Sequence, residues 1–258
     1  RDRYPSYSAV GSAAAAIPGA NVVRKIVPLD RENRLDVAAI CAAIDSDTRV
    51  VVICNPNNPT GTKITLSEIE QIISKTPSEA LVFVDEAYIE FTDDPASETA
   101  IEFAKSRSNV LVSRTFSKIH GLAGLRVGYG IADARVISRL KDYMLGGLAF
   151  NMPGILAAQQ AIDDQDHIRA TLKLNRTIHE TWTKFFHDVG WQMTPSVTCF
   201  AWVNLGTDCS PLVKFLADRN VLVGGGQRWD LPSYIRISIG TEEENEMLLS
   251  GVKAFLAA

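Results

Sequence analysis

Apolar residues in the first half of the chain come in short, nearly continuous runs rather than alternating with polar residues. Valine and isoleucine dominate these runs, which lie at 21–27, 49–55, 80–86, 109–114 and 126–132. Such runs are typical of strands buried on both faces of a parallel sheet. Between them, residues 35–45 carry apolar positions at helical spacing, and Thr65 and Glu68 form a capping box that begins another helix. The pattern therefore predicts an α/β fold with a mostly parallel sheet.

The pattern changes after about residue 132. Two helices are predicted, at about 153–163 and 166–188. Shorter elements follow at 199–205, 211–219, 220–224 and 234–240, and a closing helix begins at a second capping box, Thr241 to Glu244. We therefore predict a large domain over residues 1–170 and a smaller C-terminal α+β domain over residues 171–258.

Composition narrows the class of protein. The chain has 258 residues, is 46% hydrophobic and 22% charged, and has a net charge of −4, which argues against a nucleic-acid or anionic-membrane surface. No apolar run is long enough to span a membrane. The cysteines form no metal-site spacing and no dense disulfide framework, and those at positions 41, 54 and 199 are interpreted as core residues. A cytoplasmic protein is expected.

Three polar segments follow predicted strands directly. They are "NPNNPTG" (55–61), "DEAY" (85–88) and the turn that contains Lys118. Ligands bind at the carboxyl edge of an open parallel sheet. Each segment alone has an ordinary interpretation: a turn, a helix cap formed by an acidic pair, or a solvated lysine. Their common position favours a site, and we expect Lys118 to be buried there, because an unused buried lysine would be costly.

Four segments together resemble a known family. "NPNNPTG", "VDEAYIEF", "RTFSKIHGLAGLRVG" and "YIRISIGT" are similar, in order and spacing, to fold-type I aminotransferases that use pyridoxal 5'-phosphate, most closely the histidinol-phosphate aminotransferase branch. The resemblance covers essentially the whole chain. It begins partway along the family's chain, so the family's N-terminal part, which supplies backbone amides to the cofactor phosphate and a tyrosine across the dimer, precedes the match.

The resemblance implies roles for residues in these segments. Lys118 would form the Schiff base with the cofactor and move the substrate's Cα proton. Asp85 would pair with the pyridinium nitrogen, and Asn58 and Tyr88 would donate to the phenolic oxygen of the ring. Hydroxyl groups and a guanidinium suit a phosphate, and the matching residues are Thr115, Ser117 and Arg126. Arg126 has an alternative interpretation as a partner of a surface carboxylate. Tyr7 would stack on the ring, although a core tyrosine is nearly as good an interpretation.

The resemblance also implies a substrate site and a homodimer. Arg236 would clamp the substrate α-carboxylate, with a sheet-edge arginine as the alternative. Histidinol-phosphate enzymes carry a further arginine where this chain has glycines 224–226, and Arg228 is the candidate to replace it. Trp229 beside it would face an aromatic or guanidinium substrate, or anchor the loop.

The implied reaction is transamination between an L-amino acid, such as histidinol phosphate or an aromatic donor, and a 2-oxo acid such as 2-oxoglutarate. A decarboxylase, a lyase or an oxidase of the same fold would use the same cofactor residues. A non-catalytic aminotransferase-like domain is the alternative from a different class.

Overall fold

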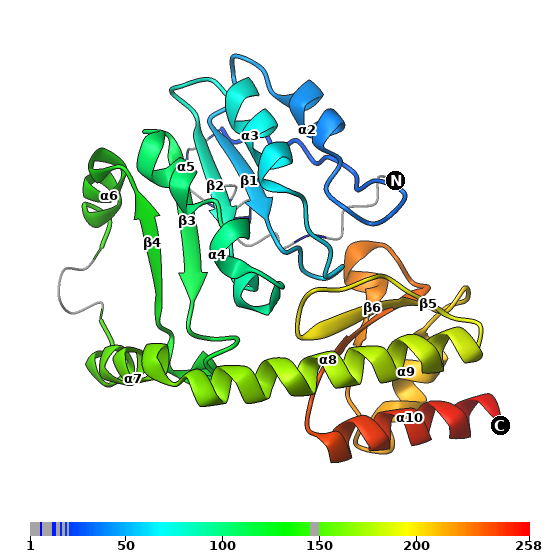
Figure 1. Ribbon diagram of the computed structural model, residues 1–258. Coiled ribbons are helices and arrows are strands. Elements are labelled where there is room, and N and C mark those ends of the chain that lie inside the picture. The colour runs from blue at the N-terminus through cyan, green and yellow to red at the C-terminus, as the bar shows by residue number, and fades with distance from the viewer. Residues whose placement is uncertain (1–5, 7–11, 14–15, 17–18, 20, 145–149) are drawn as a thin grey trace.

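Two four-stranded sheets organise the computed structural model, which describes residues 6, 12–13, 16, 19, 21–144 and 150–258 (Figure 1). The first sheet contains, in spatial order, β1 (Val50–Cys54), β2 (Leu81–Asp85), β3 (Val110–Thr115) and β4 (Gly128–Ala132). The second contains β5 (Gln192–Met193), β6 (Phe200–Asn204), β8 (Tyr234–Ser238) and β7 (Gly224–Gly225). The sheets belong to separate halves of the chain, as the change of pattern indicated.

Three strands of the first sheet are parallel and the fourth is not. β1 pairs with β2, and β2 with β3, in parallel, whereas β4 runs antiparallel to β3. The connection from β3 to β4 holds only a 3-10 turn, η2 (Ala123–Leu125), and no helix that could return the chain to the start of β3. The predicted burial of 126–132 is wrong, because β4 is an edge strand with exposed glycines. Gly128 is needed there, since a Cβ atom would lie 2.7 Å from the carbonyl oxygen of Arg114.

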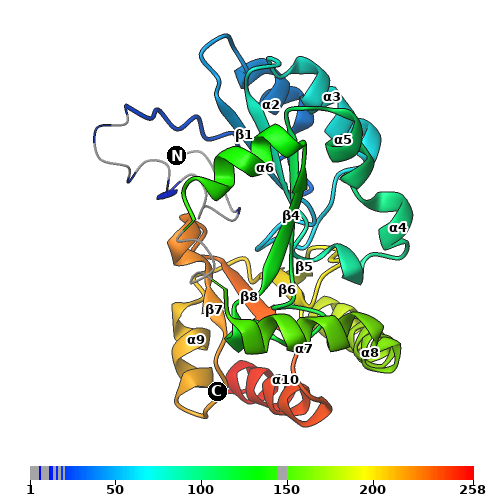
Figure 2. The ribbon, with the colours of Figure 1, turned by 90° about the vertical axis from the view of Figure 1, so that its left-hand side faces the viewer.

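Helices cover one face of the first sheet. They are α2 (Val37–Ala43), α3 (Leu66–Lys75), α4 (Pro95–Glu98) and α5 (Ile101–Ser106), and Figure 2 shows the last three on one side of the strands. Ile69 and Ile72 of α3 pack with Ile53 and Val82 in the core. Positions that point the other way, such as Val52 and its neighbours in β2, are only half-buried. Burial on both faces was predicted, and the described residues provide it on one.

Two predicted strands are wrong. Residues 21–27 form no strand, and Val23 is 84% exposed. Valine and isoleucine favour a strand only where a neighbour accepts the backbone hydrogen bonds, and no described strand lies beside this segment. Of residues 220–224, only Gly224 enters a strand, and Leu222 is 85% exposed.

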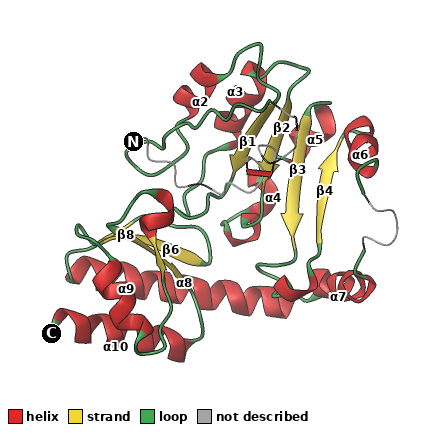
Figure 3. Ribbon diagram, turned by 180° about the vertical axis from the view of Figure 1, so that it is seen from behind, coloured by secondary structure: helices red, strands yellow, loops and turns green. Residues whose placement is uncertain are grey.

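Four of the remaining helices agree closely with the sequence pattern, and the first, α6 (Ala134–Lys141), was not predicted. The four are α7 (Met152–Asp163), α8 (Gln165–Asp188), α9 (Ser210–Ala217) and α10 (Glu242–Leu256). Both predicted capping boxes form, at the starts of α3 and α10. Figure 3 shows α8 passing from the end of the first sheet to the face of the second. The domain division at residue 170 stays a prediction, since α8 is continuous across it.

Candidate functional site

The carboxyl ends of β1, β2 and β3 meet at one edge of the first sheet. Cys54 pairs with Asp85, and Asp85 with Ser113, so the three strands end in register. The segments 55–61, 85–88 and 116–118 therefore leave the sheet side by side. This convergence is the arrangement that the strand pattern predicted.

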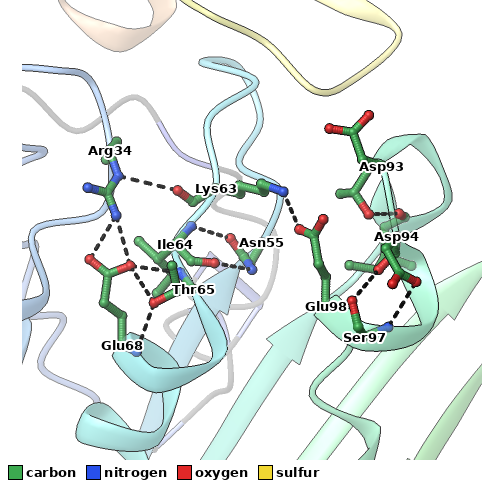
Figure 4. A network of polar contacts seen from close by, with 12 residues as sticks. Arg34, Asn55, Lys63, Ile64, Thr65, Glu68, Asp93, Asp94, Ser97 and Glu98 are labelled. Atoms are coloured by element: carbon green, nitrogen blue, oxygen red, sulfur yellow. Dashed lines mark hydrogen bonds and ion pairs between the residues drawn. The ribbon is translucent and has the colours of Figure 1, made fainter.

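The loop after β1 is held by its own side chains. Asn55 donates to the carbonyl oxygen of Ile64 at 3.1 Å and accepts from its backbone N–H at 2.8 Å (Figure 4). Asn57 donates to the Thr60 hydroxyl at 2.8 Å. Asn58 lies inside this fixed loop, and its side-chain oxygen is buried with no hydrogen-bond partner in the described part of the chain. A buried polar atom of this kind is poised to contact a ligand.

Ion pairs hold the far end of the same loop. Arg34 makes two hydrogen bonds, at 2.7 and 2.8 Å, to the carboxylate of Glu68, the residue that completes the cap of α3. Lys63 pairs with Glu98 of α4, so the loop is attached on both sides (Figure 4). The loop that carries Asn58 is therefore held to α3 and α4, two of the helices that cover the first sheet.

Asp85 ends β2 in a half-buried position. Its carboxylate accepts from the Ala87 N–H at 3.2 Å and from the Ser113 hydroxyl at 3.4 Å. Burial raises the pKa of Asp85, while these hydrogen bonds and the positive charge of Lys118 oppose the rise. Asp85 and Lys118 thus act on each other electrostatically, as a shared site requires.

Tyr88 joins the two sheets. Its ring is buried and makes an edge-to-face contact with Phe200 of β6, with centroids 5.1 Å apart. The Lys118 Nζ lies 5.3 Å from the centroid of the Tyr88 ring. Burial raises the pKa of Tyr88, and the charge of Arg236 opposes that rise. Tyr88 therefore lies between the lysine of the first sheet and the arginine of the second.

The expected burial of Lys118 is wrong, because its side chain is exposed. Its neighbours Phe116 and Ile119 are buried and anchor the turn from the other side. Lys118 projects beyond the carboxyl edge of the sheet, where the described residues leave it open to solvent. Lys118 lies at the predicted edge of the sheet, but it is exposed rather than buried.

The hydroxyl groups and the arginine predicted to bind phosphate lie together beside Lys118. Arg126 donates to the Ser117 hydroxyl at 3.3 Å and to the Ala123 carbonyl oxygen at 2.9 Å. The Thr115 hydroxyl accepts from the Ser117 N–H at 3.0 Å. Arg126 has φ 53°, a left-handed conformation that costs a non-glycine residue about 1 kcal/mol or more. Such strain is typical of functional positions and here directs the guanidinium toward the turn.

Arg236 lies at the centre of the second sheet, on the side facing Tyr88. Trp202 and Gly224 are its neighbours across the strands. Its guanidinium carbon lies 3.9 Å from the centroid of Phe200, and it donates to the Ser238 hydroxyl at 3.2 Å. The Nε atom is buried without a partner among the described residues.

Arg228 lies close to Arg236. It belongs to the 3-10 helix η4 (Gly226–Trp229) and stacks on Trp229, with its guanidinium carbon 3.7 Å from the ring centroid. Burial and the charge of Arg236 both lower the pKa of Arg228. In the described part of the chain neither arginine has a carboxylate partner. Two neighbouring guanidinium groups without a counter-ion suit an anionic ligand.

Nearly the whole chain matches a known protein family. Residues 4–252 match the model of aminotransferase class I and II. The chain belongs to this aminotransferase family. A curated relative, histidinol-phosphate aminotransferase of Brevibacillus brevis, is 38% identical over 237 residues, which are 92% of this chain and 64% of the relative. The chain thus spans less than two thirds of that relative's length.

Solved structures agree with the family assignment. A candidate histidinol-phosphate aminotransferase from Erwinia carotovora atroseptica is 29% identical, with a TM-score of 0.90 over 98% of this chain and 72% of that one. Histidinol-phosphate aminotransferase from Sinorhizobium meliloti, solved in complex with pyridoxal-5'-phosphate, is 24% identical, with a TM-score of 0.88 over 98% of this chain and 70% of that one. The predicted family and the α/β aminotransferase fold are confirmed.

Sequence reasoning missed two residues of the site. Phe200 supports both Tyr88 and Arg236. Cys199 was interpreted as a core residue, and it does pack against the buried cluster around Tyr88. Burial raises the pKa of its thiol, while the charges of Arg236 and Lys118 oppose the rise, so Cys199 also borders the site. The pairing of 199–205 with 234–240 would have revealed both, but one sequence does not give that register.

The described residues also limit other kinds of site. Tyr7 lies outside them. They contain no group of three or more histidine, cysteine, aspartate or glutamate side chains that could hold a metal ion, and their helices include none long and apolar enough to cross a membrane. A separate groove of about 400 Å³ lies between the sheets, lined in part by Asn33, Thr62, Thr194 and Tyr234. It contains none of the predicted site residues.

Proposed function

We propose that this member of the aminotransferase family catalyses transamination between an L-amino acid and a 2-oxo acid, with pyridoxal 5'-phosphate bound at the carboxyl edge of the first sheet. The observation that carries the proposal is the convergence of Asp85, Tyr88 and Lys118 from the first sheet with Arg236 from the second. The relatives' names and the cofactor in the Sinorhizobium meliloti structure support it.

The residues at this edge fit the cofactor. Ser117 and Arg126 form a hydrogen-bonded donor pair of the kind that binds phosphate oxygens, and Asn58 lies in the fixed loop beside them. When bound, pyridoxal phosphate supplies an aldehyde carbon for the amino group and a ring that accepts the electron pair left at the substrate Cα. The protein has to hold, orient and protonate the reacting groups.

Each residue of the site has a distinct task in this proposal. Lys118 would hold the cofactor covalently through Nζ and later carry the proton away from the substrate Cα. Asp85 would keep a proton on the ring nitrogen, and Asn58 and Tyr88 would donate to the ring's phenolic oxygen. Arg236 would hold the α-carboxylate in a two-point contact and so orient the Cα–H bond.

The substrate side chain would extend toward Arg228. The unpaired charges of Arg228 and Arg236 suit a donor with a second anionic group, and the face of Trp229 suits a flat ring. We therefore propose histidinol phosphate or an aromatic amino acid as the donor and 2-oxoglutarate as the acceptor. Gly224 leaves room between the two arginines, because it adds no side chain on this face of the sheet.

The test begins with the cofactor. Pyridoxal phosphate is added to the purified protein, the visible spectrum is recorded, and borohydride reduction is followed by peptide mapping. The label is expected on Lys118 and absent from Lys118→Ala, while Lys105→Ala, a change on an exposed helix, keeps it. Product analysis then decides the reaction. A new amino acid formed from the added 2-oxo acid supports transamination, whereas carbon dioxide or peroxide indicates a decarboxylase or an oxidase, and no turnover a non-catalytic domain.

A homodimer forms part of the proposal. The family resemblance implies it, and α7 exposes large apolar residues, including Met152 at 57% and Leu156 at 60%. Sedimentation equilibrium measures the mass directly, and a monomer at micromolar concentration would contradict this part of the proposal alone.

A further inference from the structure

Behind the Asp85–Tyr88 turn lies a buried cluster of two carboxylates and one guanidinium. We call it the Glu86–Arg114–Glu90 cluster. The exposed fractions of the three side chains are 1%, 15% and 19% in that order. One cation between two buried carboxylates leaves a surplus negative charge if both acids are ionised, which is expensive away from water.

Glu86 is fully partnered. Its carboxylate accepts from the Arg114 Nε at 3.0 Å, from the Ala100 N–H at 2.6 Å and from the Thr99 hydroxyl at 2.8 Å. These donors satisfy both carboxylate oxygens of Glu86, as a buried carboxylate requires. Glu86 is therefore the hydrogen-bonded ion-pair partner of Arg114.

Glu90 has weaker support from the described residues. Its Oε1 lies 3.8 Å from the Arg114 Nη1, too far for a hydrogen bond, and its Oε2 is buried with no hydrogen-bond partner among the described residues. Burial raises the pKa of Glu90 to about 7, the backbone N–H of Glu90 itself and the charge of Arg114 on β3 oppose the rise, and the nearby charge of Glu86 adds to it. Tyr129 on β4 pairs with Arg114 across the strands and interacts with it electrostatically.

The cluster connects the strands that carry the proposed cofactor residues. Glu86 directly follows Asp85, and Glu90 in the 3-10 helix η1 (Ile89–Phe91) lies two residues after Tyr88. Arg114 lies in β3 between Ser113, which donates to Asp85, and Thr115. A shift of Arg114 would therefore displace both Ser113, which contacts Asp85, and Thr115.

We propose that Glu90 is a positioning residue whose proton leaves Arg114 to Glu86 and so keeps the Asp85–Tyr88 turn in place against β3. Loss of the proton creates a second carboxylate that competes for Arg114 and repels Glu86. The turn then loosens, and cofactor binding weakens as pH rises. The effect on the cofactor rests on the proposed function, whereas the proton on Glu90 does not.

The first test uses the protein without added cofactor. An unfolded glutamate releases its proton near pH 4.3 and Glu90 in the folded protein near pH 7, so the folded state binds more protons between these values and stability falls as pH rises. Between pH 5.5 and 8.5 the melting temperature of Glu90→Gln should fall by about 5 °C less than that of the wild type. The control Glu102→Gln, at an exposed acid paired with Lys105, should match the wild type.

The second test uses the cofactor. The dissociation constant of pyridoxal phosphate, measured at pH 6.5 and 8.5, should rise several-fold more in the wild type than in Glu90→Gln. Equal pH dependence of melting in wild type and variant would overturn the proposal. If the protein binds no pyridoxal phosphate at all, the proposed function fails, and the melting comparison still decides the state of Glu90.

A measurement on the unaltered protein covers the case in which Glu90→Gln does not fold. The infrared carbonyl band of a protonated, buried carboxyl group should be present at pH 6 and disappear by about pH 8. Its absence at pH 6 would show that Glu90 is already ionised and would contradict the proposal.

Discussion

The guanidinium group of Arg236 stacks on the ring of Phe200, with 3.9 Å between the guanidinium carbon and the ring centroid. The two residues lie on β8 and β6, which pair directly, so the stack is built into the sheet. It orients the planar guanidinium, and Nε is buried without a hydrogen-bond partner among the residues that the structure describes. A fixed, partly unpaired guanidinium is what a two-point contact with a carboxylate requires.

Arg236→Lys tests this relationship. Lysine keeps the charge but loses the fork and most of the stack, so KM for the amino donor should rise about 10- to 100-fold. Steady-state kinetics at saturating acceptor measures it. Arg219→Lys is the matched control, because Arg219 also stacks on a ring, 3.5 Å from the centroid of Phe215, but lies outside the site. Equal effects of the two substitutions would contradict the role of Arg236.

Glycines 224 and 226 should respond differently to alanine. A Cβ atom at Gly226 would lie 2.1 Å from the Leu231 carbonyl oxygen, whereas one at Gly224 would come no closer than 3.5 Å to a neighbour. Gly226→Ala should therefore lower stability by about 2 kcal/mol or more. Gly224→Ala should change stability by less than about 0.5 kcal/mol and raise KM for the largest donors. Thermal unfolding and kinetics on both variants separate folding from substrate space, and a stable Gly226→Ala would refute the first expectation.

The sequence predicts the framework of the site better than its surroundings. The strands that end at Cys54, Asp85 and Thr115 were recognisable from their apolar runs. Because the carboxyl ends of parallel strands share one edge, three polar turns then come together. The failed strand at 21–27 and the exposed Lys118 have a common cause. Local apolarity does not reveal whether a neighbour is present to pair with a strand or cover a side chain. Phe200 and Cys199 were missed because the register of β6 against β8 depends on tertiary pairing.

Gly61→Ala should destabilise the contact between the two sheets. Gly61 has φ 74°, and a Cβ atom would lie 2.0 Å from the Ser196 Oγ, while the Gly61 carbonyl oxygen accepts from the Val197 N–H at 2.9 Å. The left-handed backbone and the clash together should cost about 2–4 kcal/mol in the free energy of unfolding. Denaturant unfolding measures the loss.

Gly206→Ala isolates the backbone part of that cost. Gly206 also has φ 74° but has nothing within 4 Å of its Cβ position, so only about 1–2 kcal/mol should be lost. Adding Ser196→Gly to Gly61→Ala should recover the difference between the two glycine variants. If Gly61→Ala costs no more than Gly206→Ala, the close approach to Ser196 is unimportant.

Asp85 and Glu86 are adjacent acids whose neutral variants should shift stability in opposite directions. Burial raises the pKa of Asp85, so the folded state keeps this proton at pH values where the unfolded chain, with a pKa near 3.9, has lost it. Stability therefore falls as pH rises above about 3.9. Asp85→Asn carries no such loss and should raise the melting temperature of the cofactor-free protein at pH 7. Transaminase activity should be lost, a trade that is common at functional positions.

Glu86→Gln is the comparison. It removes the negative charge that pairs with Arg114 and should lower the melting temperature at the same pH. Thermal scans at pH 7 and activity assays on both variants decide the matter. If Asp85→Asn melts below the wild type, as Glu86→Gln should, then Asp85 contributes to stability as an ionised, well-paired carboxylate, and its burial at the sheet edge needs no functional explanation.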